Sequence, residues 1–112
     1  MSDEELLRYA AKAMGYVEPH SYRPKTNGLL WMSESGFPTT WRPFDDDADA
    51  FKLMVKLGID VTFDDIEVYA FPPDGIGGLC EMVKENKDPY AATRRAIVRA
   101  AAEIGKEMKN AA

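Results

Sequence analysis

The chain has only one cysteine and one histidine among its 112 residues. With Cys80 alone, no disulfide can form within the chain and no multi-cysteine metal site can be built, which suits a reducing compartment. With His20 alone, a multi-histidine metal site is excluded in the same way. We expect Cys80 to be a small buried hydrophobe and His20, in a Pro-rich stretch, to lie in a surface loop.

A long apolar run and a basic N-terminus are also missing. No run approaches the length of a membrane span, and the first residues, Met-Ser-Asp-Glu-Glu, are acidic where a signal peptide would be basic. No cofactor motif stands out either, so no cofactor is expected. These features predict a cytoplasmic protein that has no contact with a membrane.

Basic residues are in the minority, with 14 Lys and Arg against 19 Asp and Glu and a net charge of −5. A phosphate-binding surface spread over the whole protein is therefore disfavoured, and nucleic-acid binding is not expected except through a local basic patch. An acidic surface suits a basic site on a partner protein instead. The length and the 46% of apolar residues predict one globular domain spanning residues 1–112.

Three segments are predicted to be helices. Residues 3–14 open with a Ser-x-x-Glu capping box and end at a glycine. Residues 46–57 start in an acidic run and are apolar over so wide an arc that this helix should be largely buried. Residues 88–108 begin with Asp88 as N-cap followed by proline, and they repeat apolar side chains on one face, with small alanines that allow close approach.

The segment between the first two helices contains several prolines and glycines. Residues 16–27 and 33–40 should therefore be irregular, with Leu29–Met32 as a short strand between them. Tryptophan and phenylalanine gather in this part of the chain, at Trp31, Phe37, Trp41 and Phe44. These rings either fold the loops onto the core or anchor a partner protein, and the core role is favoured for Trp31 and Trp41 because a small domain needs large side chains to cover its loops.

Strands follow the second helix. Residues 59–63 and 66–71 alternate apolar and polar side chains and should pair as an antiparallel hairpin. Residues 79–84 fit either a strand or a short helix, and a strand is favoured. Helices mixed with hairpins predict an α+β fold, in which a small antiparallel sheet of two to four strands packs against three helices.

Two stretches invite a ligand-binding interpretation. The aspartates from Asp45 to Asp49 resemble the start of a calcium loop, but Ala50 stands where glycine is required and Lys56 where glutamate is required, so helix capping is favoured over metal binding. Residues 75–78, Gly-Ile-Gly-Gly, suggest a phosphate-binding loop, but no Lys-Ser or Lys-Thr follows, and a hairpin loop is favoured.

Arg94 falls inside the apolar arc of the last helix and therefore needs an acceptor. We expect it to pair with a carboxylate of the acidic run, which would tie the last helix to the second. The candidate partners are Asp46, Asp47 and Asp49. The alternative is that Arg94, Arg95 and Arg42 together hold an anion.

Two segments, Trp41–Ala50 and Asp88–Ala96, resemble a loose group of short phage and prophage proteins that includes the NinX-type family. In that group an aspartate-alanine helix start is followed by strands and by a final helix that opens with an Asn/Asp-Pro step. The resemblance implies an accessory protein that acts inside a bacterial cell. The family has no established activity, so it implies no catalytic residue.

The leading hypothesis is a non-enzymatic protein that binds a host or phage protein, including one of a host defence system. The alternative is a small-molecule or nucleotide-binding domain that uses Arg94, Arg95 and the loop at residues 75–78. A metal-dependent hydrolase or nuclease has the least support, because no histidine or glutamate completes a site. A monomer and a homodimer through the closing helix both fit the sequence.

Overall fold

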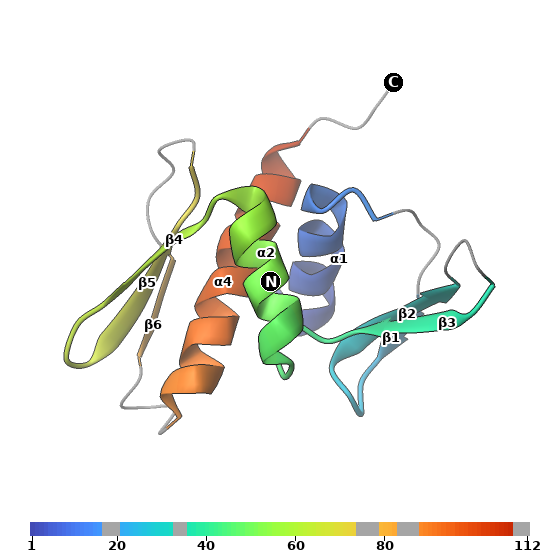
Figure 1. Ribbon diagram of the computed structural model, residues 1–112, viewed down its shortest axis with the longest axis horizontal. Helices are drawn as coiled ribbons and strands as arrows, with labels where there is room; N and C mark the ends of the chain where they lie inside the picture. Colours follow the sequence, from blue (N-terminus) through green and yellow to red (C-terminus); the bar gives the residue numbers. More distant parts are fainter. Residues whose placement is uncertain (17–20, 33–35, 74–78, 83–87, 109–112) are drawn as a thin grey trace.

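The computed structural model describes residues 1–16, 21–32, 36–73, 79–82 and 88–108 (Figure 1). In chain order, the helices and strands are α1 (Asp3–Ala13), β1 (Ser21–Arg23), β2 (Gly28–Met32), β3 (Pro38–Trp41), α2 (Asp47–Leu57), β4 (Asp60–Phe63), β5 (Glu67–Phe71), β6 (Leu79–Met82) and α4 (Pro89–Glu107). The predicted α+β class is confirmed, as are the strand at residues 79–82 and the antiparallel pairing of β4 with β5.

Each helix begins where its capping residues predict. Ser2 Oγ accepts a hydrogen bond from the backbone N–H of Glu5 at 3.1 Å, and the Glu5 side chain accepts one from the backbone of Ser2. Asp46 caps α2 and Asp88 caps α4, each with its carboxylate accepting from two backbone N–H groups of the first turn. The capping role predicted for the acidic run is therefore confirmed at Asp46.

The strands are divided between two three-stranded antiparallel sheets, in the orders β1-β2-β3 and β4-β5-β6, whereas the sequence predicts one small sheet. The two sheets lie at opposite ends of the molecule with the helices between them (Figure 1). Since α2 separates β3 from β4 along the chain, each group of strands pairs with its own neighbours. A single sheet would require strands of the first group to pair with strands of the second, although the helices lie between the two groups.

The segments predicted to be irregular contain β1 and β3, so that prediction is wrong. Asn27 adopts a positive φ of 47° in the turn between β1 and β2, so the Pro and Asn-Gly there mark a hairpin turn and not a loop. Pro38 is the first residue of β3, an edge strand, where a missing N–H is tolerated.

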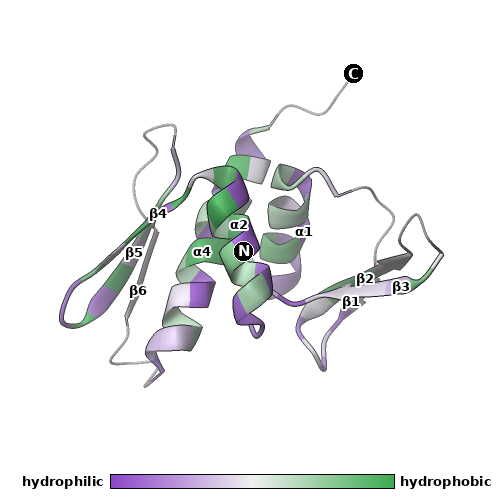
Figure 2. Ribbon diagram, in the orientation of Figure 1, coloured by the Kyte–Doolittle hydropathy of each residue, from purple (hydrophilic) through white to green (hydrophobic). Residues whose placement is uncertain are grey.

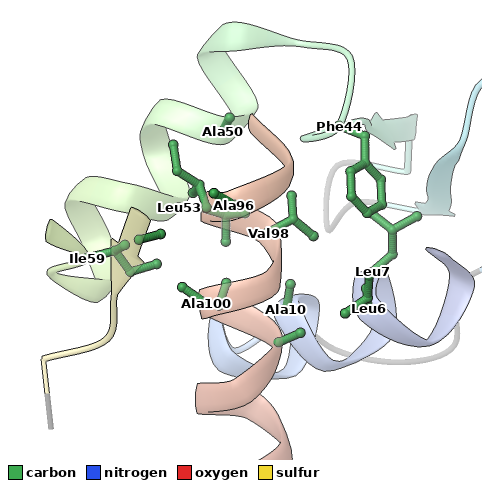
Figure 3. Packing of buried hydrophobic residues seen from close by; sticks show 14 of the residues in the cluster. Leu6, Leu7, Ala10, Phe44, Ala50, Leu53, Ile59, Ala96, Val98 and Ala100 are labelled. Atoms are coloured by element: carbon green, nitrogen blue, oxygen red, sulfur yellow. The ribbon is translucent and has the colours of Figure 1, made fainter. Parts of the chain in front are cut away.

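Helix α4 lies at the centre of the core and contacts α1, α2, β5 and β6. Hydrophobic residues concentrate on the three helices (Figure 2), and Figure 3 shows Ala96, Val98 and Ala100 of α4 among the buried side chains of α1 and α2. The small residues allow close approach: a Cβ atom on Gly105 would lie 1.8 Å from the backbone oxygen of Tyr9. The alanines therefore serve contacts within the chain, and a homodimer would need another face.

Helix α2 is less buried than its composition predicts. Of its residues, only Ala50 and Leu53 are buried, and Phe51 and Val55 are 59% and 61% exposed. The prediction of a largely buried helix is wrong because α2 packs on α4 with one side and leaves part of its apolar arc uncovered.

Candidate functional site: an apolar groove beside Arg94

A groove of about 540 Å³ lies between α2, β4 and the first half of α4. Its apolar walls include Phe51 and Met54 of α2, Val61 and Phe63 of β4, and Tyr90 and Ile97 of α4. Asp47 and Arg94 also line it. Three separate elements therefore contribute to one concave surface.

Simple periodicities explain why these side chains meet. In α4, Tyr90, Arg94 and Ile97 recur at spacings of four and three residues and so share one face of the helix. In β4, Val61 and Phe63 are two residues apart and point to the same side of the strand. The groove is the space between these faces and α2.

Three aromatic rings at the groove are exposed to solvent. The exposed fractions are 59% for Phe51, 61% for Phe63 and 70% for Tyr90. Scattered exposed apolar residues are ordinary, but apolar residues gathered around a groove mark interaction sites. Aromatic side chains are also the residues that most often dominate the energy of protein interfaces.

One acidic residue, Asp47, lines the groove, and three others directly precede or follow groove residues in the sequence. Asp46 and Asp88 cap the two helices immediately before the groove residues Asp47 and Pro89. Asp64, exposed, directly follows the groove residue Phe63. Among the described residues that line the groove, Arg94 is the one cation, and it is already paired with a carboxylate. The rim therefore favours positively charged groups on a ligand.

Arg94 binds both α2 and the segment before it. Its Nη1 donates to Asp47 Oδ1 at 2.7 Å, and its Nε donates to the carbonyl oxygen of Phe44 at 2.6 Å. The Arg94 side chain is 16% exposed and that of Asp47 76%. The structure thus selects Asp47 from the three aspartates that the sequence offers as partners.

The other two aspartates have different partners. Asp46 Oδ1 accepts from the backbone N–H groups of Ala48 and Asp49 at 2.8 and 3.2 Å. Asp49 Oδ2 accepts from the backbone N–H of Arg42 at 2.9 Å. Their carboxylates point to separate donors, and in the described part of the chain no three His, Cys, Asp or Glu side chains are placed to hold a metal ion.

Arg95 faces α1 and not the groove. Its Nη2 donates to Asp3 Oδ1 at 2.8 Å, and its guanidinium lies 5.1 Å from the centre of the Phe44 ring. The hydrogen bond from Arg95 holds the pKa of Asp3 below its usual 3.8, outweighing the opposite effect of burial. Since Arg94 and Arg95 pair with aspartates of different helices, the structure does not combine them into one anion pocket.

The remaining predicted site residues lie away from the groove or outside the described part. Trp41 is 3% exposed and meets Tyr16 edge-on with ring centres 5.4 Å apart, so it is a core residue. Trp31 is in β2 and Cys80 in β6, but their side chains are not among those described. His20 and residues 75–78 lie outside the described residues.

The aromatic residues of the groove were not predicted as site residues. Each belongs to an apolar face that the sequence pattern assigns to the core. Their positions could have indicated otherwise, because Phe63 is the last residue of β4 and Tyr90 the second of α4. A side chain at the end of a helix or strand lies beyond the neighbouring helices and strands that cover its middle, and it therefore stays exposed to solvent.

Comparison of the chain with protein-family models, with curated proteins and with solved structures finds no match. Within the described residues, no helix combines the length and the apolar character that crossing a bilayer requires.

Proposed function

We propose that this protein is a non-enzymatic interaction protein that binds a partner protein in the groove between α2, β4 and α4. The observation that carries the proposal is the gathering of Phe51, Phe63 and Tyr90 around one apolar groove, each more than half exposed. Fully burying a side chain of this size contributes about 1.5–3 kcal/mol. Covering three such rings supplies the central cluster that a protein interface needs.

The chemistry of the groove describes the partner segment. Large apolar side chains fit between Phe51 and Phe63, and Lys or Arg flanking them meet the acidic rim at Asp47 and Asp88. A second copy of this chain suits the rim less well, because the protein carries a net charge of −5. The partner is therefore a different protein with a basic, amphipathic segment.

The resemblance of Trp41–Ala50 and Asp88–Ala96 to NinX-type phage proteins supports a bacterial setting for this binding. In this proposal the partner is a host or phage protein in the bacterial cytoplasm. Inhibition of a host defence system is one biological outcome that such binding would serve.

The test is affinity capture from native cells with a tagged protein, with partner identification by mass spectrometry. The variant Phe63→Ser/Tyr90→Ser removes two rings of the groove. The matched control Ile66→Ser/Phe71→Ser removes two apolar side chains that are 45% and 38% exposed and do not line the groove. Substitutions at exposed positions change stability by about 0.5 kcal/mol or less, whereas Phe71 stacks on Tyr69 and should cost more. Melting curves of both variants establish that they are folded.

The proposal predicts a stoichiometric partner that is captured by the wild type and the control and lost with the groove variant. Binding of the purified partner should weaken at least tenfold in the groove variant and should also weaken with added salt, because the rim is acidic. A partner that both variants retain equally would show that the groove is not the binding site.

A small-molecule site is the second candidate, because 540 Å³ lies within the range of ligand pockets. Arg94 would orient an anionic ligand once Asp47 moves aside. Thermal unfolding with nucleotides and with apolar carboxylic acids tests this, since a ligand at 100 times its Kd stabilises the fold by about 2.7 kcal/mol. Asp47→Asn should then strengthen binding of the anion. If none of these ligands raises the melting temperature, this candidate is rejected.

A further inference from the structure

The sheet β1-β2-β3 presents a second surface, at the other end of the molecule from β4–β6 (Figure 1). Its inner face packs on the core through Leu29 and Trp41, which are 0% and 3% exposed and pair across the strands. Tyr22, the partner of Leu29 in β1, also packs against the core. Because side chains alternate along a strand, the side chain of Arg23 points to the outer face. Gly28, its partner in β2, occupies the same face but has no side chain there.

Cationic side chains gather on this outer face. Arg23 pairs with Gly28 across the strands, and a Cβ atom on Gly28 would lie 2.6 Å from Cγ of Arg42. The missing side chain at Gly28 therefore leaves room for Arg42 to lie over the sheet beside it. Lys25, in the turn after β1, joins Arg23, Thr26 and Thr40 around a hollow of about 570 Å³.

These three cations differ from three arginines elsewhere in the chain. Arg8, Arg94 and Arg95 each form an ion pair with a carboxylate. Among the described residues, no carboxylate forms an ion pair with Arg23, Lys25 or Arg42. The described residues from 21 to 44 include no Asp or Glu at all.

Two acidic groups that contact this sheet are bound to donors other than its cationic side chains. Asp3 accepts from the side chain of Asn27, which in turn accepts from the hydroxyl of the inward-facing Tyr22. Asp49 accepts from the backbone N–H of Arg42 and not from its guanidinium. The molecule is 44 Å long, and charges more than about 10 Å away are largely screened at 0.1 M salt. The acidic groups at the far end therefore have little effect on a ligand bound here.

We propose that the outer face of β1-β2-β3 binds the phosphate backbone of double-stranded DNA. Arg23 in β1 and Arg42, the residue after β3, flank the middle strand, so their Cα atoms are about 10 Å apart across the sheet. Side chains at this spacing can contact separate phosphates of a polyanion, and the phosphates of a duplex border both sides of its major groove, which is about 12 Å wide. Within β1, β2 and β3, the described side chains that alternate onto the outer face include no aromatic ring on which an unpaired base could stack, which favours the duplex over a single strand.

Binding of a fluorescent 20-base-pair duplex to the full-length protein, followed by anisotropy from 25 to 200 mM NaCl, tests the proposal. Three neutralised phosphates predict a slope of log K against log[salt] of about −2.7, with a Kd of about 10⁻⁴ to 10⁻⁶ M near physiological salt. Arg23→Gln/Arg42→Gln should weaken binding at least tenfold at low salt and bring the slope to about −0.9.

The matched control is Lys52→Gln/Lys106→Gln, which changes the net charge equally at two exposed lysines outside this sheet. It should bind the duplex as the wild type does, and so should the groove variant Phe63→Ser/Tyr90→Ser. Melting curves of all variants establish that they are folded. No binding by the wild type at 25 mM salt, equal loss in the lysine control, or tighter binding of single strands or of polyglutamate than of the duplex would each overturn the proposal.

Discussion

Arg94 on α4 and Asp47 on α2 are joined by a hydrogen bond of 2.7 Å, although 47 residues separate them in sequence. The two partners are unequal, because the Arg94 side chain is 16% exposed and the Asp47 side chain 76%. Ion pairs that reach solvent contribute about 0–1 kcal/mol. Most of the stabilisation by Arg94 should therefore come from its bond to the Phe44 carbonyl and from its packed stem.

Substitutions at the two residues should accordingly differ in their effect on the free energy of unfolding. We expect Arg94→Met to destabilise the fold by about 2 kcal/mol, because the Phe44 carbonyl loses its donor. Asp47→Ala should cost less than about 1 kcal/mol. Urea unfolding of the two variants and of the double variant measures both effects and the coupling between them. Equal losses in the two single variants would mean that the ion pair itself carries the stabilisation.

Truncation of Trp41 and truncation of Phe51 should reduce the free energy of unfolding by very different amounts. Trp41 is 3% exposed and packs on Tyr16, so Trp41→Ala should cost about 3–5 kcal/mol. Phe51 is 59% exposed, so Phe51→Ala should change stability by about 0.5 kcal/mol or less. Chemical denaturation measures both. A large loss for Phe51→Ala would indicate that α2 is covered by a contact from outside this chain.

Helix ends were the most predictable features of the fold, because capping is decided by neighbours in sequence. Asp46 and Asp88 sit one residue before α2 and α4, and Ser2 one residue before α1. The β4–β5 hairpin was predictable for the same reason, since its alternation and its turn are local. The pairing of Arg94 with one of three aspartates followed from its place on the apolar arc of a capped helix.

Features that depend on long-range packing were not predictable. The strand β3 exists because Thr40 and Trp41 pair with Leu30 and Leu29, and nothing in its Pro-containing sequence indicates that pairing. The exposure of Phe51 depends on which side of α2 meets α4, and composition alone cannot decide this. The apolar groove was missed as a site because a side chain that lines it looks, in sequence, like a core residue.

Gly105 marks the closest approach of α4 to α1. A Cβ atom there would lie 1.8 Å from the backbone oxygen of Tyr9, and backbone cannot move aside as a flexible side chain does. Gly→Ala inside a helix normally stabilises by about 0.5–1 kcal/mol, but Gly105→Ala should destabilise by at least about 1–3 kcal/mol. Thermal unfolding measures the sign, with Lys106→Ala as the exposed neighbour that should change little. A stabilised Gly105→Ala variant would contradict the close packing of the two helices.

The bond between Arg95 and Asp3 predicts how stability depends on pH. The pKa of Asp3 is lowered from 3.8 in the folded chain, chiefly by the hydrogen bond from Arg95. The folded state therefore binds a proton less readily than the unfolded state, and the stabilisation is fully present above the unfolded value near 3.8. It is lost as the pH falls through the lower folded value.

Asp3→Asn should therefore reduce stability by about 1 kcal/mol at pH 7, and its difference from the wild type should shrink as the pH falls below 3.8. Arg95→Gln should show the same convergence, because it removes the donor that lowers the pKa of Asp3. Thermal unfolding between pH 7 and pH 2.5 measures these differences. Both variants break the Arg95–Asp3 bond, while Asp3 alone accepts from Asn27 and Arg95 alone lies over the Phe44 ring. The double variant should therefore lose less than the sum of the two single losses. Additive losses, or a difference that persists unchanged at pH 2.5, would show that the two residues stabilise the fold independently.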